Sequence, residues 1–285
     1  MRNKILYIYT EELKFFYLLN KELNRLKIKF KVLNLGDKIP NIPCILITTL
    51  NELKKIKNYN KKIVNIISYN KKEDFNQFIL RILASYRIGF KNNYSNLIFS
   101  IDPGIKHIGL VVFLDEYYLN SHTVYNKADL IRTIKNYVNS LQKNNQNLID
   151  LIFKFGIGIL PITKDLISSA YKTFKSRGKV KIYLIDESKS SKVKVYENKR
   201  KIPKHEASAL VLSFRNGVKV NKKNFQQYLN SNKLKKENFL LENLENLNNK
   251  TTLSEIAEKV LNGELSLSES TEIFKNAKIQ NHKII

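Results

Sequence analysis

The stretch from Leu97 to Phe113 most constrains what this chain can fold into. An apolar run ends on a single acid, Asp102, and the following Pro103 and Gly104 supply turn chemistry before a second apolar run begins. The pattern predicts a strand, a tight turn and a second strand. An ionised carboxylate at the mouth of a buried strand costs free energy unless it meets a cation or several donors. A ligand site and simple bonding to the turn's amides are both open for Asp102 at this point.

The charge balance points to a polyanionic partner. The 285 residues carry 50 Lys and Arg against 25 Asp and Glu, a net charge of +25, and such an excess favours nucleic acid. Lys, Asn and Ile are abundant throughout, a bias that the base composition of a genome also produces, so charge alone does not decide. With 43% hydrophobic residues the chain can bury a sizeable core, and its length favours two modest domains.

Cysteine content and hydropathy bear on the compartment. Cys44 is the only cysteine, which excludes a disulfide framework and a cysteine-based zinc site and fits a reducing compartment. The sequence shows no secretory leader and no apolar run long enough to span a bilayer. We therefore expect a cytoplasmic protein with no membrane partner.

Residues 1–92 alternate strand-like and helix-like segments. The expected strands are 4–10, 29–35, 44–49 and 62–68, and the expected helices are 11–27 and 73–88. The pattern predicts a small open α/β domain, to which we assign only partner or dimer contacts. It contains no Gly-rich phosphate loop, so a nucleotide site is unsupported.

Residues 96–219 predict a second α/β domain that contains the hairpin. The segments expected after it are strand 117–125, helix 127–142, strand 148–160, helix 164–175, strand 180–188 and helix 205–216. A lysine-rich linker, 188–204, precedes the last helix. Residues 220–285 predict a polar linker and a short helical tail around Gly263.

Three places in the second domain hold an acid or a histidine at the end of an apolar element. These residues are Asp102, then Asp186 with Glu187, then His205 with Glu206. Each has a structural alternative, since an acid can simply end a strand and Glu206 suits a helix N-terminus. Their joint occurrence favours a magnesium site, because that ion needs hard oxygen ligands from separate elements.

Three patterns in order resemble a known group: S-I-D-P-G-I-K-H-I-G, then I-D-E-S-K-S-S, then K-H-E-A-S-A-L-V-L. They are similar to the RNase H-like superfamily, specifically Holliday junction resolvases of the RuvC and YqgF type, over about residues 96–219. The resemblance implies an RNase H-like mixed sheet with flanking helices. It also implies an endonuclease in DNA recombination and repair that uses Mg²⁺ or Mn²⁺, acts on branched DNA and forms a homodimer.

The resemblance assigns roles residue by residue. Asp102 falls on the metal-binding aspartate of the first strand, Glu187 on the second acid, and His205 on an acidic or histidine position of the last helix. Ser208 stands where the RuvC type has another aspartate, and strand 148–160 lacks that type's glutamate. Glu206 is held as a catalytic candidate beside His205, although adjacent helix positions point about 100° apart. Candidate phosphate contacts are Lys106, His107, Lys154, Lys189, Lys192 and Lys194, each with a solvated-surface alternative.

Other functions stay open. A non-cleaving protein that binds structured DNA or RNA on the same fold is favoured by Ser208 and opposed by Asp102 and Glu187. An RNA-processing nuclease of the YqgF type is a second alternative, because charge does not separate RNA from DNA. An ATPase of the actin and sugar-kinase group would need a second phosphate-binding hairpin and an adenosine motif, and the sequence shows neither.

Overall fold

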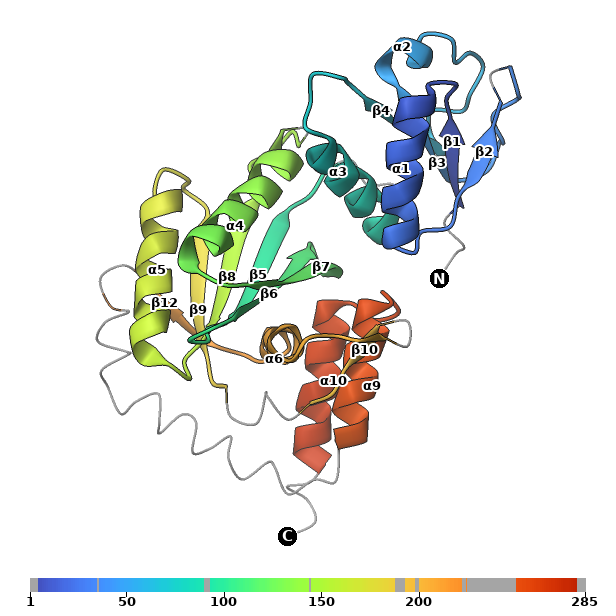
Figure 1. Cartoon of the computed structure of the whole chain (residues 1–285). Coiled ribbons are helices and arrows are strands. Elements are labelled where there is room, and N and C mark those ends of the chain that lie inside the picture. Colours follow the sequence, from blue (N-terminus) through green and yellow to red (C-terminus); the bar gives the residue numbers. More distant parts are fainter. Residues whose placement is uncertain are drawn as a thin grey trace. The chain divides into compact units, whose positions relative to one another are not determined.

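The computed structural model describes residues 5–34, 36–89, 93–143, 145–187, 193–197, 200–221, 224 and 250–280. The chain divides into two compact units (Figure 1). The first comprises 1–93 with 136–146, and the second comprises 94–135 with 147–285. The expected boundaries at 1–92, 96–219 and 220–285 stay predictions. No described helix has the length and apolar character needed to cross a membrane.

The first unit contains a four-stranded parallel sheet in the order β2-β1-β3-β4. Its elements are β1 (Ile5–Tyr9), α1 (Leu13–Arg25), β2 (Lys31–Leu33), β3 (Cys44–Thr49), α2 (Leu50–Leu53), β4 (Val64–Tyr69) and α3 (Phe75–Ile88). Every residue of β3 is buried, Cys44 included, as expected for a central parallel strand. Asp74 caps α3 by accepting a hydrogen bond from the amide of Gln77.

One buried carboxylate lies where the strand order of this sheet reverses, at the carboxyl ends of β1 and β3. Glu52 accepts hydrogen bonds from the Thr10 hydroxyl (2.6 Å), the Thr49 hydroxyl (2.7 Å) and the Glu11 amide (2.7 Å). Burial raises the pKa of Glu52, but these hydrogen bonds outweigh it and hold the pKa below its ordinary value. Open α/β sheets usually bind ligands at such a switch point. Here the Glu52 carboxylate itself accepts the hydrogen bonds of the donors at this point.

The second unit contains a six-stranded mixed sheet in the order β12-β9-β8-β5-β6-β7. The strands are β5 (Asn96–Asp102), β6 (Ile108–Leu114), β7 (Tyr117–Val124), β8 (Asp150–Gly156), β9 (Val180–Ile185) and β12 (Val218–Val220). β5, β6 and β7 pair antiparallel, whereas β8 is parallel to β5 and β9 to β8. The predicted hairpin is confirmed, with Asp102 opposite Gly109 in its register.

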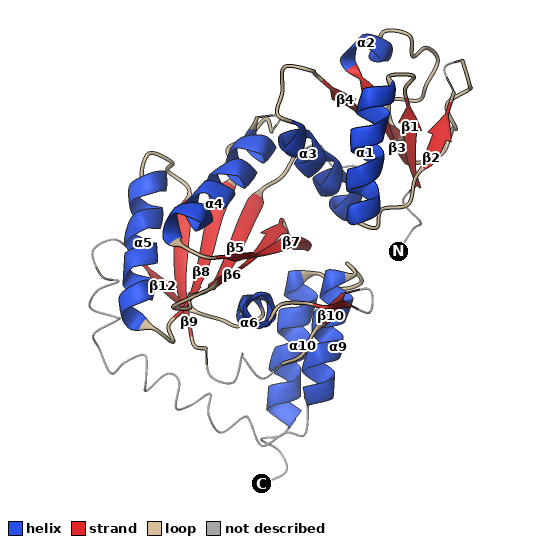
Figure 2. Cartoon of the chain, viewed as in Figure 1, coloured by secondary structure: helices blue, strands red, loops and turns tan. Residues whose placement is uncertain are grey.

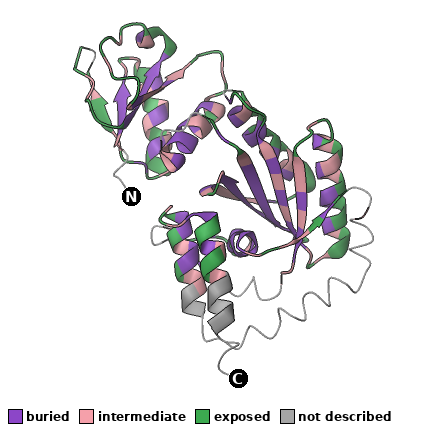
Figure 3. Cartoon of the chain, turned by 180° about the vertical axis from the view of Figure 1, so that it is seen from behind, coloured by how far each residue is buried: buried purple, intermediate pink, exposed green. Residues whose placement is uncertain are grey.

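Helices cover both faces of this sheet (Figure 2). On one face lie α5 (Leu160–Phe174) and the first part of α4 (Lys127–Gln142), and on the other lies α6 (Lys204–Ser213). Phe99 stacks on Phe153, which packs on Phe174 of α5. On the opposite face the Ser100 hydroxyl donates to the Ala209 carbonyl at 2.6 Å and holds α6 against β5. The RNase H-like mixed sheet with flanking helices is therefore confirmed, and Figure 3 shows its strands buried between these layers.

The two helices expected in the tail are α9 (Lys250–Leu261) and α10 (Leu267–Gln280), separated at Gly263. They contribute to the core of the second unit. Ile256, Ala257, Val260 and Leu261 share one buried cluster with Phe113 of β6, Leu210 of α6 and Phe214 at the end of α6.

Some element boundaries differ from the predictions. The segment expected as a linker contains a short antiparallel hairpin of β10 (Tyr196–Glu197) and β11 (Arg200–Lys201). α6 ends at Ser213, before the expected Asn216, because the chain must turn to pair β12 with β9. α5 begins earlier than expected, at Leu160, since Pro161 fits the first turn of a helix.

Candidate functional site

Asp102 and His205 meet at the end of β5 and the start of α6. Asp102 is 7% exposed, and its Oδ2 atom lies 3.1 Å from Nδ1 of His205. Burial raises the pKa of Asp102, while the contact with His205 and the nearby Lys204 act in the opposite direction. The structure therefore brings together two residues that the sequence predicts for one site.

The start of α6 reaches β5 because β6 has no side chain at Gly109. A Cβ atom there would overlap the backbone carbonyl of His205. A Cβ atom at Gly104 would lie 3.2 Å from Cε1 of the His205 ring. These two glycines of the hairpin therefore fix how closely the histidine approaches Asp102.

Glu187 reaches the same region from β9 by folding over the end of β8. Cβ atoms at Gly156 and Gly158 would overlap its carboxylate oxygens, so both glycines form a cradle for this side chain. The amide of Gly158 hydrogen-bonds the carboxylate, whereas the buried Oε1 atom of Glu187 has no hydrogen-bond partner within the described structure. An unpartnered buried carboxylate oxygen is costly without a cation.

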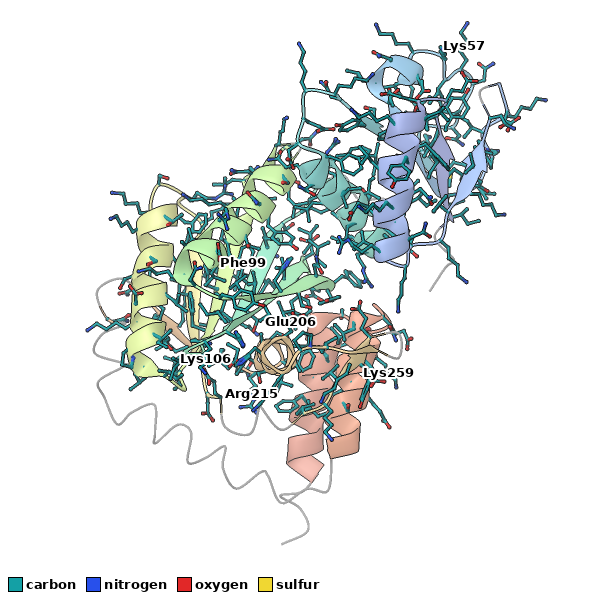
Figure 4. All side chains as sticks on the ribbon, in the orientation of Figure 1. Lys57, Phe99, Lys106, Glu206, Arg215 and Lys259 are labelled. Carbon is teal, nitrogen blue, oxygen red and sulfur yellow. The ribbon has the colours of Figure 1, made fainter. Side chains whose placement is uncertain are left out.

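Burial and neighbouring charges determine the protonation of Glu187. Burial raises the pKa of Glu187 to about 7, and the charges of Asp102 and Asp186 add to the increase. Arg215 opposes them, and its guanidinium also donates to the backbone carbonyl of Asp186 at 2.8 Å. Arg215, labelled in Figure 4, is missing from the residues predicted from the sequence, since an arginine just after a helix carries no pattern of its own.

The structure gives Glu206 different partners from those of His205. Its carboxylate accepts hydrogen bonds from the hydroxyls of Ser121 and, at 2.8 Å, Thr123, both on β7. Glu206 is thus engaged on the β7 side of α6, as the angle between adjacent helix positions suggested. Ser208, where the resemblance expects an acid, is buried in α6.

The predicted phosphate contacts are scattered. Lys106 is exposed in the β5–β6 turn, and the ring of His107 packs edge-on against His205 at 5.5 Å between centroids. The ammonium of Lys154 donates to backbone carbonyls of Ser213 and Arg215 at the end of α6. Lys194 is exposed before β10, while Lys189 and Lys192 lie outside the described residues.

The side-chain atoms at this site are of the kind that bind a divalent cation, but they are few. Asp102 offers a buried carboxylate, Glu187 a partly buried one whose Oε1 atom is covered, and His205 an imidazole. Across the described ranges, no three His, Cys, Asp or Glu side chains form a group that could hold a metal by themselves. Mg²⁺ commonly takes one or two protein carboxylates and completes its shell with water and substrate phosphates, which matches this set.

Comparisons with known proteins are weak. No family model and no curated protein matches the sequence. Similar solved structures include Thermus thermophilus RuvC, with 14% identity, 41% of this chain and 90% of that chain covered, and a TM-score of 0.27. An Argonaute of Marinitoga piezophila bound to guide RNA shows 12% identity, with 64% of this chain and only 39% of that one covered, and a TM-score of 0.25.

The MID-PIWI domains of the N. crassa QDE-2 AGO show 13% identity, with 64% of this chain and 73% of that one covered, and a TM-score of 0.26. Similarities of this size carry no argument about activity. The fold rests on the strand order described above, and the site rests on its own geometry.

Proposed function

We propose that this protein is a divalent-metal-dependent endonuclease that hydrolyses phosphodiesters of structured nucleic acid, in the manner of RuvC/YqgF-type Holliday junction resolvases. One observation carries the proposal. Among the described residues, the buried Oε1 atom of Glu187 has no hydrogen-bond partner where it lies over the end of β8, and the charge of Asp102 helps to raise the pKa of this carboxylate. Two carboxylates of raised pKa at one sheet edge are a common arrangement of catalytic sites.

In this proposal the carboxylates of Asp102 and Glu187 would hold Mg²⁺ or Mn²⁺ together with water and substrate phosphates, and His205 would complete the shell or carry a proton. A bound cation of this kind lowers the pKa of a coordinated water and offsets charge on the leaving oxygen. Asp102 engages Nδ1 of His205, so Nε2 is the nitrogen left for the cation or for a proton. Glu206 acts as a positioning residue, because its bonds to Ser121 and Thr123 fix the first turn of α6.

The test is cleavage of a labelled four-way DNA junction against linear duplex, single strand and structured RNA, with Mg²⁺ or Mn²⁺. Asp102→Asn preserves the side-chain shape and removes the charge. We expect metal-dependent cutting of the junction by the wild type and its loss in the variant. Cutting of RNA alone would favour the YqgF-type processing alternative, and a two-fold junction cut symmetrically would support a homodimer.

A non-cleaving binder of structured nucleic acid is the second candidate. It is favoured by the buried serine at position 208 and by the low number of metal donors among the described residues. Tight binding of the junction without cutting under either metal would establish this candidate and overturn the nuclease.

A further inference from the structure

The hairpin that leads into α6 has two faces of different chemistry. Tyr196 of β10 lies opposite Lys201 of β11, so their side chains share one face of the ribbon. Because side chains alternate along a strand, Val195 and Ile202 point to the other face, and both are buried. Tyr196, Lys201 and the preceding Lys194 are exposed. The outward face is therefore basic and aromatic.

The inward face fixes the hairpin to the C-terminal helices. Val195 and Ile202 belong to the buried cluster that includes Ile256 and Ala257 of α9. The amide of Ile202 donates to the Val195 carbonyl at 3.0 Å, and the Ser254 hydroxyl of α9 donates to the carbonyl of Lys194. A surface held in this way binds with less loss of conformational entropy than a flexible lysine-rich loop.

The cations of the outward face continue toward the candidate site. Lys201 is followed by exposed Lys204, which precedes His205 and influences the pKa of Asp102. Within the part of the chain that the structure describes, no ion pair involves Lys194, Lys201 or Lys204. Lys181 of β9, in contrast, is neutralised by Asp150 at 2.9 Å. When ammonium groups without an ion-pair partner bind phosphates, they displace the counterions condensed on the nucleic acid, which favours binding. An exposed tyrosine offers a ring on which a base can stack.

We infer that the outward face of the β10–β11 hairpin binds the sugar–phosphate backbone of a nucleic-acid strand and leads that strand to Asp102. The contacts are Lys194, Tyr196, Lys201 and Lys204. This inference rests on the proposed function for the choice of nucleic acid as ligand, but it does not require cleavage.

Nucleic-acid binding measured without divalent metal tests the hairpin inference separately from the proposed cleavage. The double variant Lys194→Glu/Lys201→Glu is compared with Lys172→Glu/Lys175→Glu, which makes the same charge change on exposed lysines at the end of α5, across the sheet from α6. Fluorescence anisotropy with a labelled junction and a labelled single strand gives the affinity at several salt concentrations. We expect at least about tenfold weaker binding and a log–log salt slope smaller by about 2 for the hairpin variant, from two lost phosphate contacts.

Equal losses in the two double variants would overturn the inference, since net charge would then explain the affinity. Absence of nucleic-acid binding by the wild type would overturn it together with the proposed function. Selective loss in the hairpin variant, in a protein that cuts nothing, would uphold the hairpin and reject the nuclease.

A position-specific test uses Lys201→Cys and an oligonucleotide that carries a thiol tether on one phosphate. Cys44 is fully buried, so it gives little background. Disulfide cross-linking is expected at position 201 and not in the matched Lys172→Cys variant. Equal cross-linking of both variants would contradict the hairpin as the contact.

Discussion

Glycines at positions 156 and 158 determine where the carboxylate of Glu187 lies. Gly156→Ala places a methyl group where Glu187 now sits, so the carboxylate must leave the region of Asp102. We expect loss of most metal-dependent activity, by about 100-fold or more if the carboxylate is a metal ligand. Gly178→Ala is the control, because a Cβ atom there meets nothing within 4 Å. Full activity of Gly156→Ala would remove Glu187 from the site.

Metal binding is measurable without cleavage. A cation that binds only the folded protein stabilises it by about 2.7 kcal/mol at a hundredfold excess over its dissociation constant. We expect Mg²⁺ or Mn²⁺ to raise the melting temperature of the wild type and to have no such effect on Asp102→Asn or Glu187→Gln. The exposed Asp165→Asn serves as control and should respond like the wild type. An equal response in all variants would place the metal elsewhere.

The carboxylate of Glu52 makes the stability of the first unit depend on pH. Its folded pKa lies below the unfolded value, so ionised Glu52 contributes stability above the unfolded pKa, and that stability is lost as pH falls through the folded pKa. Glu52→Gln should lower the free energy of unfolding by about 1–3 kcal/mol at pH 7 and by less at about pH 3. Urea unfolding at the two pH values checks this. If wild type and Glu52→Gln differed by the same free energy of unfolding at both pH values, the charge of Glu52 would not contribute to stability.

At the residue scale the sequence predicted one site from Asp102, Glu187 and His205, since each ends or begins an apolar element, and the structure places the three side chains in one region. It did not decide the partners of Glu206, because a mostly apolar helix gives no polar face from which to judge direction. Lys154 illustrates the same limit. A lysine in a strand pattern can point to either face, and only the packed structure shows the carbonyls that it meets.

Among the elements, α6 carries His205 at its start, and Lys154 donates hydrogen bonds to carbonyls at its far end. Lys154→Met keeps the chain length and leaves the carbonyls of Ser213 and Arg215 without this donor, so we expect a loss of about 1–3 kcal/mol in urea unfolding. Lys181→Met on the adjacent strand removes only a partly exposed ion pair and should cost at most about 1 kcal/mol. Equal stability of the two variants would contradict a structural role for the hydrogen bonds of Lys154.

Most elements follow from hydrophobic periodicity, and those that do not are short. β10 and β11 have two residues each and β12 has three, too few for a period to be visible. The lysine-rich composition of 188–204 reads as a linker because the buried Val195 and Ile202 are isolated in sequence. Their partners on α9 lie more than fifty residues later, beyond the reach of any local pattern.

For the molecule as a whole, the tail helices help to hold the second unit together. Leu261 is 1% exposed in the cluster that also contains Phe113 and Phe214. Leu261→Ala should destabilise the protein by about 2–5 kcal/mol, whereas Ile273→Ala, at 39% exposure, should cost much less. Thermal unfolding checks the pair. Similar effects for both would mean that the tail contributes little to the core.

The succession of strands and helices in the second unit was predicted from the sequence as far as α6, and three consecutive strands followed by helix-linked strands leave few sheet topologies. The position of the tail helices was not predictable, since the long polar stretch before them gives no indication of which surface they cover. The net charge of +25 indicated a polyanion but not the surface that binds it. That choice depends on which lysines are already paired, as Lys181 is.

Cys44 gives the first unit a natural chemical probe. The thiol lies fully buried in β3, and burial raises its pKa, so it is shielded and protonated while the sheet is closed. A maleimide can reach it only when that sheet opens, and no other thiol in the chain competes. The labelling rate of the unmodified protein therefore reports how often the sheet around Cys44 opens.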